Sequence, residues 1–251
     1  ALRELLPGEN IFYIGDTARV PYGGKSRQTI ERYAVEITGL LLAENAKMIV
    51  VACNSASALA IPRLEEILKV PVIGVIAPGA KAAVEATRNG RIGVIGTRAT
   101  VYSGAYERAI HELNPKARVV SRPCPMLVPL IEEGWLDDAI TAQVIARYLD
   151  ETVVERIDTL VLGCTHYPLI ADAIKKFAGP KIRLVDSARN CAIAVKALLK
   201  KEKIAAPITN TGWLQVALTD KSDGFLRIAE QALGLQIGDV RLLSVQNVAQ
   251  A

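Results

Sequence analysis

The sequence predicts an α/β fold built on mostly parallel sheets, and three observations support that prediction. Short apolar, β-rich runs alternate with helical patterns along most of the chain, which favours parallel strands buried on both faces. Hydrophobic residues make up 51% and charged residues 22% of the 251 positions, so the chain can bury the core of one large or two ordinary domains. Two strands far apart in the sequence both end in a cysteine followed by two polar residues, which suggests two related α/β units.

The predicted elements follow one another in regular order. A strand over 10–16 leads to a helix over 28–46, for which Ser26 is a candidate N-cap. Further strands are expected over 47–53, 70–76, 91–97, 117–123, 158–164, 181–187, 208–220 and 239–245. Further helices are expected over 57–69, 79–90, 101–115, 139–157, 169–179, 190–204 and 224–234.

The two strands that end in cysteine share a longer pattern. Cys53 closes one strand and Cys164 closes the other. Val75, in the strand after Cys53, and Asp186, in the strand after Cys164, each lie 22 residues further on. Ligands of open α/β sheets bind beyond the carboxyl ends of strands, where helix N-termini offer free N–H groups. We therefore expect this edge to stabilise a carboxylate ligand and to lower the pKa of a nearby thiol.

Two thiols that reach one cleft from opposite sides suit a particular reaction. One thiolate removes a proton from a stereogenic carbon, and the other thiol returns a proton to the opposite face. The carbon acid is very weak, so such a site has to exclude water and stabilise the developing charge. This chemistry would explain why a cysteine closes each of the two strands.

The other cysteines are predicted to be structural, because free cysteine is among the most commonly buried residues. Cys124 lies between prolines and Cys191 in the first turn of a predicted helix. A zinc site is not favoured, since the chain has two histidines and no C-x-x-C, and Cys164-x-His166 has the wrong spacing. The lack of C-x-x-C also argues against a disulfide oxidoreductase. His166 is instead a candidate acid, base or charge partner of the thiol.

Charge and hydropathy limit the expected partners. The net charge of +4 gives no clustered basic stripe of the kind that nucleic-acid binders carry. The longest nearly apolar stretch, 70–80, has 11 residues with two prolines and two glycines, which is too short and too broken to cross a membrane. The opening "ALRELLPGEN" lacks the basic and apolar regions of a secretion signal. A reduced, cytoplasmic protein is therefore expected.

Three stretches resemble the glutamate racemase family, within the wider aspartate/glutamate racemase superfamily. They are "GDTARVPYG" at 15–23, "ACNSAS" at 52–57 and "GCTHYP" at 163–168, with smaller similarities in "CPMLVPLIEEG" at 124–134 and "LVDSA" at 184–188. The resemblance runs from about residue 1 to about residue 245. Aspartate and hydantoin racemases share the two-cysteine plan, whereas the first and third stretches point to glutamate racemases.

The resemblance implies two pseudo-symmetric α/β domains with the active site in the cleft between them. The discontinuous first domain, 1–76 plus 187–251, would carry Cys53, and the second, 77–186, would carry Cys164. The implied activity is the interconversion of L- and D-glutamate without pyridoxal phosphate or metal, supplying D-glutamate for peptidoglycan synthesis. The implied partners are this small-molecule substrate and a second copy in a homodimer, with no nucleic acid and no membrane.

The site residues follow by match to the family motifs. Cys53 would take the α-proton from D-glutamate, and Cys164 would take it from L-glutamate. His166 and Glu132 would support Cys164, with the adjacent Glu133 as the alternative acid. The implied substrate contacts are Tyr22, Gly23, Asn54, Ser55 and Thr165.

Two features differ from the family pattern. In the family, a strand and a "DSGxGG" loop precede the segment with which the printed sequence opens, and the aspartate of that loop supports the first cysteine. Ser55 stands where threonine is usual and keeps the hydroxyl. The alternatives are a racemase of aspartate or another amino acid, or a non-catalytic amino-acid-binding protein if that loop is truly absent.

Overall fold

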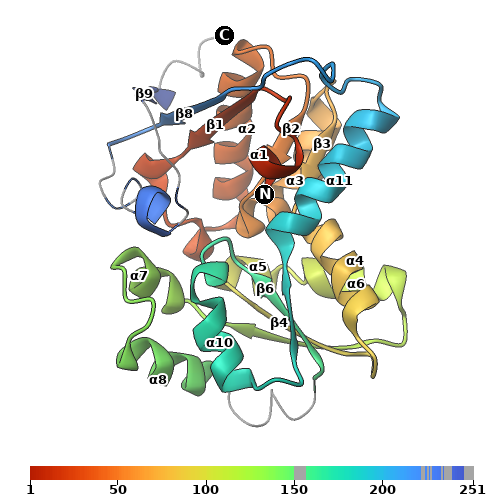
Figure 1. Ribbon diagram of the computed structural model, residues 1–251, viewed down its shortest axis with the longest axis vertical. Helices are drawn as coiled ribbons and strands as arrows, with labels where there is room; N and C mark the ends of the chain where they lie inside the picture. The colour runs from red at the N-terminus through yellow and green to blue at the C-terminus, as the bar shows by residue number, and fades with distance from the viewer. Residues whose placement is uncertain are drawn as a thin grey trace.

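The computed structural model confirms the α/β class (Figure 1), and every pair of neighbouring strands that it describes is parallel. The structure describes residues 1–149, 157–221 and 239–245, together with 224, 226, 228–232 and 234. All the candidate site residues lie within these ranges. The sheets fall into two groups, each with its own covering helices.

A four-stranded sheet forms the centre of one half of the molecule. Its strands, in spatial order, are β5 (Arg118–Pro123), β4 (Arg91–Gly96), β6 (Thr159–Gly163) and β7 (Arg183–Asp186). Successive side chains of a strand point to opposite faces, and the core packing follows that alternation. Ile92 and Val94 of β4 pack into one core cluster, whereas Ile95 packs into another. Burial on both faces explains the nearly continuous apolar sequence of β4 and β6.

The other half contains two smaller parallel sheets. One has the order β1 (Ile11–Gly15), β8 (Leu214–Leu218) and β9 (Val240–Leu242), and the other pairs β2 (Ile49–Val51) with β3 (Val72–Gly74). Helices α2 (Arg27–Ala43) and α3 (Asn54–Ile67) pack against each other beside these strands (Figure 1). The predicted cap of α2 is confirmed, because the Ser26 hydroxyl accepts the N–H of Thr29 at 3.3 Å.

The remaining helical segments cover the sheets and connect them. The α-helices are α1 (Leu2–Leu5), α4 (Ile76–Ala86), α5 (Arg98–Tyr102), α6 (Ala105–Leu113), α7 (Leu127–Glu132), α8 (Ala139–Tyr148), α10 (Ala171–Ala178) and α11 (Ser187–Lys201). The shorter turns are η1 (Thr17–Arg19), η2 (Tyr22–Gly24), η3 (Tyr167–Ile170) and the π-helical η4 (Ile228–Ala232).

Helix α11 brings the chain back to the half that contains the small sheets. The thiol of Cys191 on α11 donates to the carbonyl oxygen of Gly74 on β3 at 3.8 Å. Asp186 is the N-cap of α11, and its carboxylate accepts the N–H of Ala188 at 2.8 Å. This connectivity is what a discontinuous first domain requires, while the proposed division into 1–76 plus 187–251 and 77–186 stays a prediction.

Several element boundaries differ from the sequence prediction. The helix expected over 101–115 is broken into α5 and α6, because Gly104 between them adopts a left-handed conformation with φ of 66°. Helix α3 begins at Asn54 rather than at 57, which makes Cys53 its N-cap. Helix α7 was not predicted, because prolines within and before it obscure the helical pattern.

Two predicted helices fall partly outside the described residues. Of the helix expected over 139–157, the structure describes α8, whereas residues 150–156 lie outside the described ranges. Of the helix expected over 224–234, the described part includes η4. Neither segment contains a candidate site residue.

Candidate active site

Cys53 lies where β2 passes into α3, as the N-cap of that helix. Burial of the sulfur is the largest influence on its titration and raises the pKa of the Cys53 thiol. Hydrogen bonds from the N–H groups of Ala56 and Ser55 lower it, but by less. The expectation that the helix N-terminus leaves this thiol with a lowered pKa was therefore wrong. The N–H groups act in the expected direction, and desolvation of the thiolate outweighs them.

Cys164 directly follows β6 and is linked through a histidine to a carboxylate. His166 Nδ1 lies 3.8 Å from Cys164 Sγ, and His166 Nε2 lies 3.2 Å from Glu132 Oε1. Burial lowers the pKa of His166, but its hydrogen bonds with Cys164 and Glu132 raise the pKa to about 9 overall. His166 is therefore an imidazolium at neutral pH, with one N–H directed at the sulfur and the other at the carboxylate.

The carboxylate that contacts His166 belongs to Glu132 and not to the adjacent Glu133. Glu132 is the last residue of α7, whereas Glu133 is the C-cap of that helix. The ion pair with His166 is formed by Glu132. Thr165 lies beside the same ring, is exposed, and places its Oγ1 3.4 Å from His166 Nδ1.

The two thiols lie close enough to influence each other. After the larger effects of burial and of the Ala56 N–H, the charge of Cys164 is the next influence on Cys53, and it raises the pKa. A Coulomb interaction weakens with distance, so its presence agrees with thiols that follow strands on facing halves of the molecule. One thiol comes from the carboxyl end of β2 and the other from the carboxyl end of β6.

The β4–α5 junction connects the surroundings of the two cysteines. Gly96 on β4 lies in register with Gly163 on β6, so Thr97 and Cys164 leave the sheet side by side. The hydroxyls of Thr97 and Ser55 share a hydrogen bond of 2.8 Å. Ser55 is therefore held against the half of the molecule that carries the second thiol.

Asn54 lies directly after the first thiol and is buried, with 2% of its surface exposed. Its Oδ1 accepts a hydrogen bond of 2.7 Å from the hydroxyl of Tyr106 on α6. Its Nδ2 is also buried and has no hydrogen-bond partner within the described ranges. A buried amide donor without a partner is costly, so this nitrogen is suited to an acceptor on a ligand.

Tyr22 and Gly23 form part of the η2 turn that faces the β4–α5 junction. The Tyr22 hydroxyl donates to the carboxylate of Asp16, and Arg19 Nε donates to the same carboxylate at 2.8 Å. A Cβ on Gly23 would lie only 2.6 Å from the Cβ of Thr97. Glycine is therefore required for the close approach of this turn to Thr97.

Three residues that contact the candidate site residues were missed by sequence reasoning: Asp16, Thr97 and Tyr106. Asp16 lies inside a motif that was recognised, and its carboxyl group at a strand end was the available signal. Thr97 follows a predicted strand, but its position beside Cys164 depends on the order and register of the strands. Tyr106 lies on the buried face of a helix, where an aromatic residue usually indicates only packing.

The remaining cysteines are buried, in agreement with a structural role. The thiol of Cys124 donates to the carbonyl oxygen of Arg122 at 3.6 Å. Cys191 packs in the small core cluster between α11 and β3, against Val75 and Val195. Both thiols are thus accounted for by packing and by backbone contacts.

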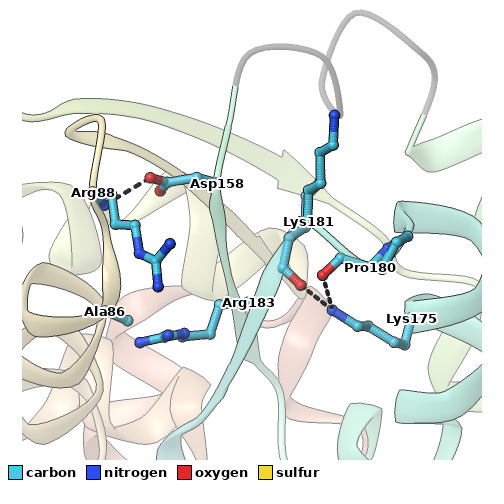
Figure 2. A pocket seen from close by; sticks show the side chains of 8 residues that line it. Ala86, Arg88, Asp158, Lys175, Pro180, Lys181 and Arg183 are labelled. Carbon is cyan, nitrogen blue, oxygen red and sulfur yellow. Dashed lines mark hydrogen bonds between the residues drawn. The ribbon is translucent and has the colours of Figure 1, made fainter.

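A surface hollow of about 380 Å³ lies at the opposite, amino-terminal edge of β6 and β7 (Figure 2). Asp158 Oδ2 accepts the N–H groups of Arg88 and Asn89, each at 2.7 Å. Lys175 Nζ donates to the carbonyl oxygen of Pro180 at 3.2 Å. These groups tie turns of the backbone together, and the hollow is separate from the cysteine site.

Two kinds of feature are absent from the part of the chain that the structure describes. In those ranges, no group of three or more His, Cys, Asp or Glu side chains is arranged to hold a metal ion. No helix among the same residues is long and apolar enough to span a membrane.

Comparison with known proteins gives consistent matches over nearly the whole chain. A family model described as Asp/Glu/Hydantoin racemase matches residues 1–197. The glutamate racemase of Geobacter metallireducens is 45% identical over 241 residues, which cover 96% of this chain and 89% of that protein. The glutamate racemase of Syntrophus aciditrophicus is 47% identical over 240 residues, again covering 96% and 89%.

Solved structures of glutamate racemases also match nearly the whole chain. The glutamate racemase isoform RacE1 from Bacillus anthracis superposes with a TM-score of 0.92 at 40% identity, covering 97% of this chain and 91% of that one. The glutamate racemase from Francisella tularensis in complex with D-glutamate superposes with a TM-score of 0.90 at 35% identity, covering 98% and 92%.

Proposed function

The chain belongs to the Asp/Glu/Hydantoin racemase family, and we propose that it interconverts L- and D-glutamate by proton exchange at the α-carbon. The relatives that support this substrate are glutamate racemases at 45% and 47% identity over most of both chains. A structural relative with a TM-score of 0.90 was solved in complex with D-glutamate. The observation that supports the chemistry best is the 2.8 Å hydrogen bond between Ser55, two residues after Cys53, and Thr97, which leaves the sheet beside Cys164.

In the proposed reaction, the two thiols exchange roles in each turnover. Starting from D-glutamate, the Cys53 thiolate takes the α-proton: an S–H bond forms, the C–H bond breaks, and the electron pair moves into the adjacent carboxylate. The Cys164 thiol then gives its proton to the opposite face of the same carbon, which leaves L-glutamate, a Cys53 thiol and a Cys164 thiolate. Starting from L-glutamate, the same steps run in reverse.

The surroundings of each cysteine suit this exchange differently. At Cys164, the imidazolium of His166 directs an N–H group at the sulfur, and Glu132 holds the ring in place. Around Cys53, the N–H groups of Ala56 and Ser55 stabilise a thiolate against the opposing effect of burial. Burial also keeps water from the carbanion that forms during the reaction.

Substrate contacts are proposed from the residues that surround the two sulfurs. Asn54 offers an amide N–H group that has no partner among the described residues, which suits a substrate carboxylate. Ser55 and Thr165 offer hydroxyls beside the first and second thiol. The turn that contains Tyr22 and Gly23 would close the site from the side of β1.

The remaining proposals concern the wider setting of the reaction. The thiols themselves supply acid and base, so we propose that the reaction needs neither pyridoxal phosphate nor a metal ion. Two free catalytic thiols require a reducing compartment, which supports a cytoplasmic location. We also propose a role in supplying D-glutamate for peptidoglycan, action as a homodimer, and a division into domains 1–76 plus 187–251 and 77–186.

A substrate panel followed by circular dichroism tests the proposed activity. The purified protein is incubated separately with L-glutamate, D-glutamate, L-aspartate and D-aspartate, without added cofactor, and the loss of optical activity is recorded. Glutamate should lose its signal from both directions and at a higher kcat/KM than aspartate. Faster turnover of aspartate would assign the protein to the sister activity, and binding of glutamate without turnover would indicate a non-catalytic binding protein.

A further inference from the structure

Tyr106 donates its hydroxyl proton to Asn54 from the other half of the molecule. Asn54 is the first residue of α3, directly after Cys53, whereas Tyr106 lies on α6. Each is 2% exposed, and the Tyr106 hydroxyl lies 2.7 Å from Asn54 Oδ1. An amide oxygen can only accept a hydrogen bond, so the phenol is the donor in this contact.

The phenol is held as a donor by its surroundings. Burial raises the pKa of Tyr106, and a hydrogen bond with the Ser187 hydroxyl only partly offsets this effect. The phenol therefore keeps its proton across the neutral range. The phenol hydroxyl therefore lies near Ser187, at the start of α11, while it donates to Asn54 on α3.

The position of the ring is fixed by close packing against α4. A Cβ on Gly79 would lie 3.0 Å from the Tyr106 hydroxyl oxygen and 3.3 Å from the Cβ of Ser187. Helix α4 can approach the phenol this closely because residue 79 has no side chain. The hydroxyl consequently has little freedom to move away from Asn54.

This contact decides which end of the Asn54 amide is available. Because Oδ1 accepts from Tyr106, the Nδ2 of the amide points away from the phenol, and this buried nitrogen has no partner within the described ranges. We propose that Tyr106 is a positioning residue that holds the Asn54 amide with its N–H group toward a carboxylate of the substrate. The inference rests on the proposed function and assigns Tyr106 no direct contact with the reacting atoms.

The first test is Tyr106→Phe, which removes one oxygen and leaves the ring to pack as before. Without the hydroxyl, the Asn54 amide is free to turn its oxygen toward the substrate carboxylate. KM for glutamate should rise roughly 3- to 10-fold in both directions, the range that one neutral hydrogen bond gives. The value of kcat should stay within about twofold, because the lost contact binds substrate and transition state alike.

Thr159→Val is the matched control. Thr159 is also fully buried, and its hydroxyl donates to the Asp158 carboxylate at 3.0 Å. It is the first residue of β6, at the end of the strand away from the cysteines. The control variant should lower the melting temperature, as Tyr106→Phe does, and leave KM unchanged. A Tyr106→Phe protein that melts at a lower temperature but keeps the wild-type KM would reduce Tyr106 to a packing residue and overturn the inference.

A double variant tests whether Tyr106 acts through Asn54. If it does, Asn54→Ala and Asn54→Ala/Tyr106→Phe should have the same KM, because the amide that Tyr106 orients is already gone. A further rise in KM in the double variant would contradict the inference. Calorimetric titration with D-glutamate gives the same comparison as a binding constant if the Asn54 variants turn over too slowly. A wild-type protein that binds glutamate without racemising it would refute the proposed function and leave this comparison intact.

Discussion

His166 connects Cys164 to Glu132, with Nδ1 3.8 Å from the sulfur and Nε2 3.2 Å from the carboxylate oxygen. Cys53 is supported differently, by backbone N–H groups at the start of α3. The second histidine of the chain, His111, lies on α6 and contacts the carbonyl oxygen of Ala117 at 3.1 Å. Of the two proposed proton carriers, Cys164 thus has a histidine beside it and Cys53 has backbone N–H groups, although each thiol follows the end of a parallel strand.

Removing the charge of Glu132 should weaken the support of Cys164. In Glu132→Gln, the imidazolium of His166 loses its carboxylate partner, so the charged ring becomes less stable beside the sulfur. We expect kcat for glutamate to fall roughly tenfold or more, in line with the loss of a charge-assisted hydrogen bond. Glu133→Gln is the matched control, and it should retain wild-type activity. Equal losses in both variants would contradict the assignment of Glu132.

The titration of His166 is accessible by NMR because the chain has two histidines. Its ring resonances should titrate with a midpoint near 9, above the usual value of about 6.5. His111→Gln assigns the signals, and Glu132→Gln should move the midpoint down. A wild-type midpoint at or below about 6.5 would contradict the described contacts.

The same shift predicts how stability depends on pH. A histidine whose pKa is raised in the folded state contributes its full stabilisation at pH values below its unfolded pKa of about 6.5. That contribution is lost as the pH rises through about 9. Denaturant unfolding should therefore show a larger difference between wild type and His166→Gln at pH 6 than at pH 10. If the difference between wild type and His166→Gln were the same at both pH values, His166 would titrate alike in the folded and unfolded states.

Gly23 is expected to be intolerant of even a methyl group. In Gly23→Ala, the new Cβ would lie 2.6 Å from the Cβ of Thr97, so the turn has to move away from the β4–α5 junction. We expect a loss of roughly 1–3 kcal/mol in unfolding free energy and a higher KM for glutamate. In Gly24→Ala, the Cβ would have no heavy atom within 4 Å, and stability should stay within about 0.5 kcal/mol. Similar effects of Gly23→Ala and Gly24→Ala would argue against the close approach of the η2 turn to Thr97.

Much of the fold was predictable from the sequence because strand and helix periods differ. The apolar run at β6 lies where it was expected, and α11 overlaps the predicted helix over 190–204 but begins at Ser187. The break at Gly104 was harder to predict, because the apolar period continues across it and the left-handed turn depends on one residue. Helix α7 was missed for a similar reason, since proline interrupts its pattern.

The site was predictable in the residues that follow strands and less so in those that meet through packing. Cys53 and Cys164 stand out because thiols with polar neighbours are unusual at the ends of apolar strands. The choice between Glu132 and Glu133 needed the structure, because one residue turns a helical side chain by about 100°. Tyr106 also needed it, since its contact with Asn54 joins segments 52 residues apart.

Exchange of the α-proton in D₂O, measured for single cysteine variants, tests the two-thiol account most directly. With L-glutamate as the starting material, the α-proton NMR signal and the optical activity are followed together. The wild-type protein should place deuterium at the α-carbon as it forms D-glutamate. Cys191→Ala, which changes a buried thiol outside the site, should behave in the same way.

Cys53→Ala and Cys164→Ala should each abolish racemisation, because each leaves one face of the carbon without a proton carrier. A positioned acid or base usually contributes roughly 10²- to 10⁴-fold, and the expected loss in each variant is at least that large. If either single variant racemised glutamate at the wild-type rate, the proposal that two opposed thiols carry the proton would be wrong.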